Sequence, residues 1–428
     1  MDEIIKYSEK CKYFEDLYDI FWKLYENDKI EKKHYSNISI GLFNTPCGGF
    51  GDIIVCKTFY DYLTEWYPGA SISICTTAPG KYRDLGINGN IYKLSERGKD
   101  KTDTECIDYS KLVLKKKIKF DIMIAIPIIN KSFEINRFKK LIPYANVFNT
   151  FSVSEYNGDF PPYTFPIGVG KGELGLLFNN FKYTQQNIIK KPYAMVYIQP
   201  SPEWGVHSKY CFLSYLEMIC INYREKHSFF QIIIPDWIND EIMNNNDFKR
   251  RVMKICGIYY DNISVVGKND AIFLKGELSK RSYLVFRADI LPQKRDIFIS
   301  LMKDSVNDIL VTGDQSLSDI LSCCNYKKVW YQIAPWKKGL AENLSKHLPN
   351  KNYETFKTSC GNLKNINTKI DWKNFMKNYD FRINGRKRMD SILIGNYNYK
   401  TSDELPKLLE IIEKSRYLET AQKKLSKL

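Results

Sequence analysis

Short apolar runs alternate with longer amphipathic stretches along most of the chain. The amphipathic stretches at 53–67 and 209–226 carry apolar residues at helical spacing. The apolar runs have the length of buried strands, and they occur at 37–43, 71–77, 120–128, 193–200, 229–235, 262–267, 283–288, 308–313 and 328–334. Strands that alternate with helices in this way predict α/β units built on parallel sheets.

Two such series of strands and helices are separated by a stretch rich in Pro, Gly and polar residues between about 160 and 190. A chain of 428 residues is also too long for one ordinary hydrophobic core. We therefore expect two Rossmann-like, doubly wound α/β domains, at 1–175 and 190–350, that face each other across a cleft. A basic, mainly helical C-terminal extension is expected over 351–428.

The formal net charge of +15 favours an anionic partner, such as nucleotide phosphates, nucleic acid or an acidic glycan. The charge is uneven, because 351–428 holds 17 Lys or Arg against nine Asp or Glu. A solvated basic surface would show the same excess. Composition therefore keeps a nucleic-acid partner open without selecting it.

Cysteine and histidine usage bears on the compartment and on metals. None of the 11 cysteines forms a CxxC pair, and many stand inside apolar runs, which predicts reduced, buried thiols. The four histidines lack the spacing of metal ligands, so no metal site is expected. The first residues do not resemble a secretory signal, and no apolar run approaches the roughly 18 residues of a membrane span. These patterns predict a soluble, cytoplasmic protein without a transmembrane segment.

A glycine-rich loop, CGGFGD, follows the first strand and precedes a helix. The dinucleotide pattern G-x-G-x-x-G is incomplete, since Ile54 stands where its last glycine would be. Asp52 at the helix start is either a capping or first-turn acid, or a general base that faces the cleft. The glycines would let the backbone approach an acceptor, and they are Gly48, Gly49 and Gly51.

Loops of the second predicted domain contain side chains and backbone N–H groups that could bind the phosphate and the base of a nucleotide. The segment VTGDQSLSDIL turns at a glycine after a strand and starts a helix, whose N–H groups suit a phosphate. Structural capping explains much of the same pattern. His207, in the loop after the domain's first strand, could contact either substrate, and we assign it to the acceptor. The candidate donor-binding residues are Ser201, Lys209, Arg287, Thr312, Gly313, Asp314, Gln315, Ser316, Trp336 and Lys337.

Taken in order, these loops resemble the GT-B glycosyltransferases, and among them the heptosyltransferase-like group. The resemblance covers about 37–350 and rests on GFGDIIVCKTFYDYLTEWYPGASISICTT, VYIQPSPEWGVHSKYCF and ILVTGDQSLSDIL. It implies that Asp52 is the general base, that Lys209 binds donor phosphate, and that the loop 312–316 cradles the donor. Two departures favour a sugar other than heptose. No His follows the acid of the donor loop, and Tyr210 replaces the usual Trp.

The expected function is an inverting, metal-independent transfer of a sugar from a nucleotide-sugar to an acceptor hydroxyl. The nucleotide-sugar is a co-substrate, and no other cofactor is expected. The acceptor would be a glycan, a lipid or a protein. Two alternatives stay open at this point. One is a basic protein that binds or modifies nucleic acid, and the other is a GT-B-like structural or assembly protein without catalysis.

Overall fold

The structure is a computed structural model of the 428-residue chain. It divides into two compact units, Met1–Leu177 with Asn378–Leu428, and Phe178–Lys377, and each is described by itself. The residues that the structure describes are 38–46, 51–87, 89–96, 112–114, 118–128, 150–154, 156–157, 164–179, 181, 183, 187–200, 207–275, 282–334, 337–348, 353–367 and 370–398.

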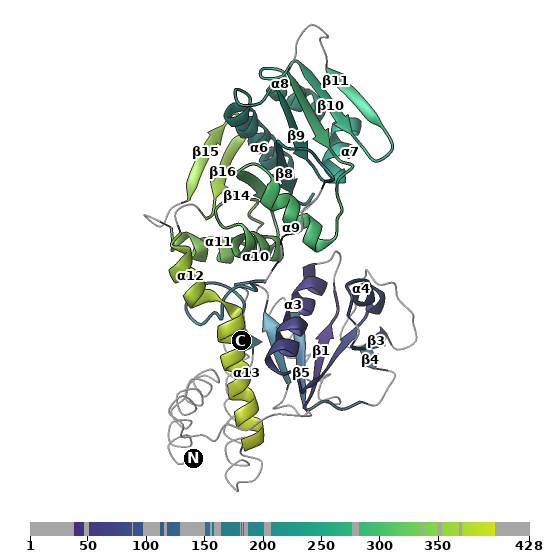
Figure 1. The fold of residues 1–428 in the computed structure, drawn as a ribbon, viewed down its shortest axis with the longest axis vertical. Coiled ribbons are helices and arrows are strands. Elements are labelled where there is room, and N and C mark those ends of the chain that lie inside the picture. The colour runs from purple at the N-terminus through teal and green to yellow at the C-terminus, as the bar shows by residue number, and fades with distance from the viewer. Residues whose placement is uncertain are drawn as a thin grey trace, which may run out of the picture. The chain divides into compact units, whose positions relative to one another are not determined.

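The first unit is built on a seven-stranded sheet of order β4-β3-β2-β1-β5-β6-β7 (Figure 1). All of its neighbouring strands run parallel except β3 and β4. The strands are β1 (Ser39–Asn44), β2 (Ser71–Thr76), β3 (Asn90–Glu96), β4 (Leu112–Leu114), β5 (Ile122–Ile128), β6 (Thr150–Ser154) and β7 (Thr164–Phe165). The helices α3 (Gly51–Trp66) and α4 (Pro79–Asp84) follow β1 and β2.

A helix from the far end of the sequence completes this unit. The chain returns as α13 (Phe381–Asn398), and the ring of Phe381 lies 5.8 Å from that of Phe59 and 6.3 Å from that of Tyr62 on α3. The hydroxyl of Tyr67 donates to Asp390 Oδ1 at 2.6 Å. Aromatic burial of this kind stabilises the helix through packing rather than through its own propensity.

The second unit is built on a nine-stranded sheet of order β11-β10-β12-β9-β8-β13-β14-β16-β15. Its strands are β8 (Tyr193–Tyr197), β9 (Phe229–Ile233), β10 (Asn262–Val266), β11 (Ala271–Lys275), β12 (Tyr283–Arg287), β13 (Asp308–Val311), β14 (Lys328–Tyr331), β15 (Glu354–Thr358) and β16 (Gly361–Asn365). Its helices are α6 (His207–Tyr223), α7 (Asp236–Asn244), α8 (Asn246–Cys256), α9 (Arg295–Asp304), α10 (Asp314–Cys323), α11 (Lys338–Ser345) and α12 (Trp372–Tyr379), the last of which crosses the boundary between the units.

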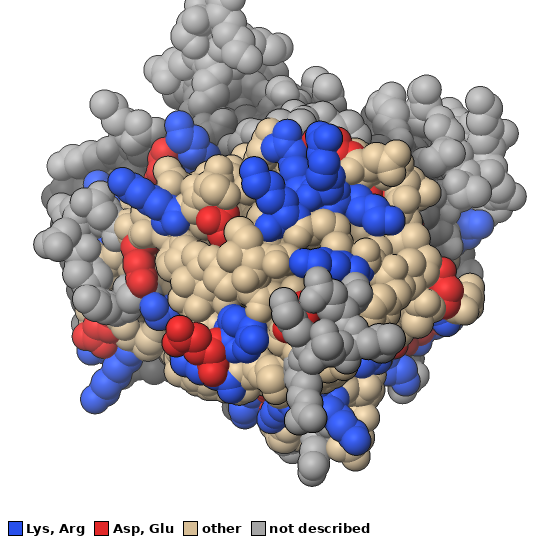
Figure 2. Space-filling model, turned by 90° about the horizontal axis from the view of Figure 1, so that it is seen from above, with Lys and Arg blue, Asp and Glu red and all other residues tan. Residues whose placement is uncertain are grey.

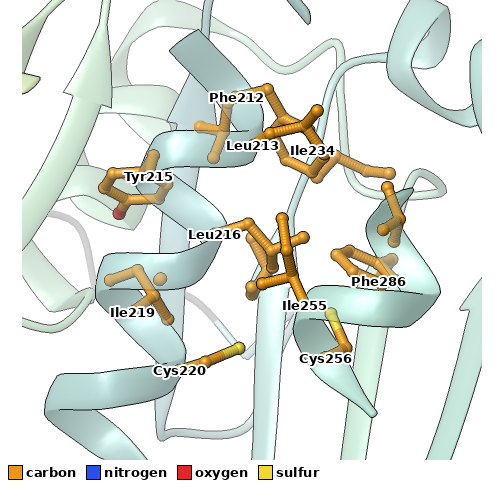
Figure 3. Packing of buried hydrophobic residues seen from close by; sticks show 14 of the residues in the cluster. Phe212, Leu213, Tyr215, Leu216, Ile219, Cys220, Ile234, Ile255, Cys256 and Phe286 are labelled. Carbon is orange, nitrogen blue, oxygen red and sulfur yellow. The ribbon is translucent and has the colours of Figure 1, made fainter. Parts of the chain in front are cut away.

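The core of the second unit lies where α6 and α8 cover the sheet (Figure 3). Phe212 and Leu216 of α6 are fully buried together with Phe286 of β12, and the thiols of Cys220 and Cys256 approach each other from the two helices. Burial raises the pKa of the Cys256 thiol well above its ordinary value. These thiols therefore behave as small apolar side chains.

The expectation of two Rossmann-like α/β domains is confirmed by two sheets whose central strands run parallel and alternate with helices. The C-terminal end differs from the expected extension over 351–428. Residues 354–365 form a hairpin, β15–β16, that pairs with β14 and extends the second sheet, while α13 belongs to the first unit. The rest of the expected helical tail, beyond 398, lies outside the described residues.

A buried carboxyl group makes the stability of the first unit depend on pH. Burial raises the pKa of Glu173 from 4.5 to about 8, and the amide of Asn157 donates to its Oε1 at 3.2 Å. A folded-state pKa above the unfolded value stabilises the fold at low pH, and this contribution is lost as pH rises from about 4.5 to about 8. Glu173→Gln should reduce that loss by about 1–3 kcal/mol, measured by chemical denaturation across this range.

The exposed Glu65 of α3 provides the control, because Glu65→Gln removes a carboxylate from the same unit without changing a buried group. Its pH profile should follow that of the wild type. Identical profiles for Glu173→Gln and the wild type would show that Glu173 ionises in the folded protein as it does in the unfolded chain.

Candidate functional site

The two glycine turns singled out in the sequence lie in different units, and both follow central strands. In the first unit, β1 pairs with β2 on one side and with β5 on the other, so the strand order reverses direction between β1 and β5. The start of α3 lies at the carboxyl end of β1. Such a reversal point is where open α/β sheets bind ligands.

The side chain of Asn44, the last residue of β1, organises this edge of the sheet. Its Nδ2 donates to the carbonyl of Ile126 in β5 at 2.8 Å and to the carbonyl of Asp52 in α3 at 3.3 Å. Its Oδ1 accepts from the hydroxyl of Tyr82 in α4 at 2.6 Å. One buried amide thus joins two strands and two helices, and it fixes where α3 begins.

Asp52 stands in the first turn of α3 and is half-buried. Burial raises the pKa of the Cys56 thiol to about 12, and the negative charge of Asp52 contributes to the rise. Burial likewise raises the pKa of Tyr82. Both neighbours therefore stay protonated at neutral pH. The helix dipole favours an ionised acid in a first turn, which suits both a structural acid and a base that accepts a proton.

The sequence interpretation missed Asn44 and Tyr82. Asn44 has a visible signal, because it is a polar residue at the end of an apolar strand and directly precedes the glycine loop. Tyr82 has none, since only the fold brings α4 beside β1. Gly51 is the exposed first residue of α3, with nothing within 4 Å of the position of an added Cβ. Gly48 and Gly49 lie outside the described residues.

In the second unit the strand order reverses between β8 and β13, and α10 begins directly after β13. Gly313 makes the turn at φ +86°, a conformation that side chains disfavour, and nothing lies within 4 Å of an added Cβ. The first helical hydrogen bond runs from the N–H of Leu317 to the carbonyl of Gly313 at 3.1 Å. The start of α10 therefore offers an open backbone approach at the positive end of a helix dipole.

Two of the predicted donor-binding side chains form a buried ion pair beside this turn. Asp314, the first residue of α10, is paired with Lys337, which directly precedes α11. The Thr312 hydroxyl donates to the carbonyl of Gln332 at 3.1 Å. These contacts hold the loop 312–316 against the loop before α11. The charge of Lys337 is neutralised by Asp314. The contacts therefore show directly that these two residues position the loop 312–316.

A second buried carboxylate, that of Asp319, fixes the first turns of α10 through hydrogen bonds to neighbouring elements. Asp319 accepts from Arg295 of α9 at 2.6 and 3.1 Å, from the amide of Asn179 at 2.6 Å and from the amide of Gln315 at 3.0 Å. Gln315 was predicted to bind the donor, and its amide contacts Asp319 instead of pointing freely into solvent. Ser316 is half-buried on the same turn. The partnership of Arg295 and Asn179 with Asp319 has no sequence signal, because the three residues are far apart in the chain.

Other predicted donor residues have protein partners in the structure. Lys209 pairs with Glu241 of α7 at 2.7 Å. Arg287 makes a two-pronged ion pair with Asp289 at 2.7 and 2.8 Å, and it also donates to Gln231. A donor role for either residue would require it to exchange or share these partners. Ser201 and Trp336 lie outside the described residues.

His207, predicted to contact the acceptor, is the first residue of α6 and lines a cavity of about 710 Å³ within the second unit. Burial lowers its pKa, which favours the neutral imidazole at physiological pH.

In the part of the chain that the structure describes, no three His, Cys, Asp or Glu side chains gather as a metal site would require. None of the described helices combines the length and the apolar character needed to cross a bilayer.

Comparison with known proteins assigns no family to this chain. No protein-family model matches it, and no curated protein matches it. Solved structures with distant similarity include enzymes of nucleotide-sugar chemistry, among them glycosyltransferases.

Three of these structures illustrate the distance. A Listeria monocytogenes protein assigned as a UDP-N-acetylglucosamine 2-epimerase has a TM-score of 0.40 and 11% identity, over 90% of this chain and 98% of its own. An alpha-glucosyltransferase in complex with UDP and a 13-mer DNA containing an HMU base has a TM-score of 0.36 and 10% identity, over 88% and 100%. A glycosyltransferase from Rickettsia africae ESF-5 has a TM-score of 0.36 and 11% identity, over 89% and 99%. At identities and TM-scores this low, the likeness assigns neither a family nor an activity.

Asp319 should be the residue that most strongly stabilises the α10 turn. Asp319→Ala leaves a partly buried guanidinium and two amides without their acceptor, so we expect a loss of about 2–4 kcal/mol in the free energy of unfolding. Chemical denaturation measures this loss. Asp247→Ala is the control, because Asp247 pairs with Arg250 and Arg251 on the exposed surface of α8 and should leave stability unchanged. Equal effects of the two substitutions would contradict a supporting role for Asp319.

Proposed function

We propose that this chain is a glycosyltransferase of the GT-B class, with an acceptor site in its first Rossmann-like domain and a donor site in its second. It would move a sugar from a nucleotide-sugar to an acceptor hydroxyl, with inversion and without a metal ion. One observation carries the proposal. In each unit a helix starts at the reversal point of a mainly parallel sheet, after β1 in the first unit and after β13 in the second, where it follows the turn at Gly313.

The second unit supplies the donor side of the proposed reaction. The leaving nucleoside diphosphate carries negative charge, and the start of α10 offers a helix dipole and an open backbone at Gly313 to stabilise it. The Asp314–Lys337 pair and the contacts of Asp319 hold this helix start in place before a donor binds. A preformed site costs little reorganisation during the reaction.

The first unit supplies the acceptor side. The Asp52 carboxylate would take the proton of the acceptor hydroxyl, whose oxygen then forms a bond to the anomeric carbon of the donor sugar. The bond between that carbon and the diphosphate breaks, and the diphosphate leaves with the electron pair. Displacement from the opposite face inverts the anomeric configuration. The acceptor is a glycan, a lipid or a protein in this proposal, and Gly51 at the exposed start of α3 would give it backbone access.

A nucleic-acid partner is the other candidate raised by the net charge of +15. Figure 2 shows several Lys and Arg side chains gathered in one part of the face that it displays, while other basic side chains are scattered among acidic ones over the rest of that face. Several surface cations have carboxylate partners, including Arg250 and Arg251 with Asp247, and Lys268 with Asp236 at 2.6 Å. No contact in the described residues favours nucleic acid over another polyanion, so we do not propose this function.

Asp52→Asn should remove sugar transfer while it leaves the fold and donor binding intact. The amide keeps the size of the side chain but cannot accept the hydroxyl proton, so the rate should fall by about 10²–10⁴-fold. Turnover of a nucleotide-sugar with release of the nucleoside diphosphate is the measurement, and the melting temperature reports the fold.

Asp61→Asn is a matched control, because Asp61 lies on the same helix with an exposed side chain that pairs with Lys57. It should keep full activity. Wild-type turnover by Asp52→Asn would rule out Asp52 as the base. The same assay with a chelator tests the metal-independent step, which predicts unchanged turnover.

Ser316→Glu should separate donor binding from stability. A carboxylate in the first turn of α10 suits the helix dipole, so the melting temperature without ligand should not fall. The same charge repels a donor diphosphate, so affinity should drop by about tenfold or more. Thermal shifts with UDP-, GDP-, ADP-, CMP- and dTDP-sugars identify the donor class on the wild type and test the variant.

Asn246→Glu places the same charge at the exposed start of α8 and serves as the control. It should leave every thermal shift unchanged. A wild type that none of the five donor classes stabilises would favour a GT-B-like protein without catalysis over a transferase.

A further inference from the structure

The cavity of about 710 Å³ beside α6 is not part of the proposed donor site. It is bounded by the first turns of α6, the end of β14, α11 and the β15–β16 hairpin, all within the second unit. Its volume falls in the range of sites for small molecules. The hairpin that closes it is the element that extends the sheet beyond the expected α/β pattern.

The cavity and the α10 turn are formed by different side chains. Lys338 lines the cavity, whereas Lys337 is paired with Asp314 at the α10 turn. On α6, His207 and Tyr210 line the cavity, whereas Lys209 is paired with Glu241 of α7. Of the described residues predicted to bind donor or acceptor, only His207 lines it. A ligand in this cavity would therefore use a different set of side chains from a donor at α10.

Three tyrosine rings in the cavity wall indicate what kind of ligand the cavity can bind. Tyr210 of α6, Tyr331 of β14 and Tyr353 before β15 all line it. Two of these rings already carry a cation on one face. The ammonium of Lys364 lies 5.6 Å from the ring centre of Tyr353, and the guanidinium of Arg251 lies 5.6 Å from that of Tyr210. Phenol rings in such a wall suit a flat ring system, which they bind by stacking or edge contact.

The charged groups around the cavity favour an anion. Lys338 and Lys364 line it, and their side chains reach solvent. The carboxylate that also lines it, Glu342, lies 3.6 Å from Lys338 in an exposed pair that holds the lysine only weakly. The helices α6 and α11 both begin at lining residues, His207 and Lys338, so their dipoles add positive potential.

We propose that this cavity is a second ligand site, which binds a nucleoside monophosphate or a closely similar ring phosphate. The ring would lie against the tyrosines, and the phosphate would face Lys338 and Lys364. Lysine ammonium groups form charge-assisted contacts with phosphate, and these two lysines line the cavity from different elements, α11 and β16. The proposal does not depend on sugar transfer, because it rests on the cavity and its lining side chains alone.

Isothermal titration of the full chain with UMP and AMP, and with uridine and adenosine as uncharged counterparts, tests the site. The wild type should bind a nucleotide, and removal of the phosphate should weaken binding by about tenfold or more. The double variant Lys338→Glu/Lys364→Glu should lose this binding by about tenfold or more, whereas Lys249→Glu on α8 should bind as the wild type does. Far-ultraviolet circular dichroism confirms that each variant is folded.

Ser316→Glu distinguishes the two sites. If nucleotides also bind at α10, the wild type binds two equivalents, Ser316→Glu removes one, and the lysine variant removes the other. If the proposed transferase function is wrong, the wild type still binds one equivalent, and only the lysine variant loses it.

Thiol protection gives an independent readout. Cys360 lines the cavity and is half-buried, while Cys323 at the end of α10 is also half-buried and does not line it. UMP or AMP should slow alkylation of Cys360, followed by peptide mass spectrometry, and leave the rate at Cys323 unchanged. Absence of nucleotide binding by the wild type at millimolar concentration would overturn the proposal. A lysine variant that binds as many equivalents as the wild type, or binding that only Ser316→Glu removes, would overturn it as well.

Discussion

Parallel pairing of β1 with β5 and of β8 with β13 fixes the sheet edges at which α3 and α10 begin. Parallel strands place all of their carboxyl ends on one edge of a sheet, and the helices that follow must start there. At these two pairs the chain also changes the direction in which it adds strands. Such a reversal point is where open α/β sheets bind ligands.

Buried polar groups fix the positions of the helices that begin at these sheet edges. Asn44 joins β1, β5, α3 and α4 through one amide, and Asp319 joins α10 to α9 and to the segment near Asn179. At the amino end of β13, on the opposite edge of the sheet, the buried Asp308 accepts from the hydroxyl of Tyr223 at 2.6 Å and the indole of Trp330 at 2.8 Å. Each group is costly to bury unless all of its partners are present, so each specifies one arrangement of its neighbours.

Some Lys and Arg side chains of this protein form ion pairs within the fold, and others are available to bind a ligand. Lys209, Arg287 and Lys337 neutralise carboxylates of their own domain, and Lys337 does so inside the fold. Lys338 and Lys364 reach solvent at the rim of a cavity. The excess positive charge is therefore no guide by itself to where an anion binds. Local carboxylate partners decide which cations remain available.

The sequence by itself determined the α/β class, most strand positions and the glycine turn at 313. The apolar runs of β1, β2 and β5, and those of β8, β9 and β13, are buried by the sheets that they form, and glycine at 313 is required by a positive φ. Such signals are local, because the pattern that predicts a buried strand or a turn lies within a few consecutive residues. The hairpin β15–β16 was missed because its strands alternate polar and apolar residues at a sheet edge, without a continuous apolar run.

Only the tertiary structure decided which polar side chains meet. It paired Asp314 with Lys337, gave Asp319 to Arg295 and Asn179, and turned Lys209 toward Glu241. It also brought α13 back to the first unit and closed a cavity with residues from four elements of the second. The physical reason is that a side chain's partners depend on which strands and helices pack together. That packing is set by contacts between residues far apart in the chain.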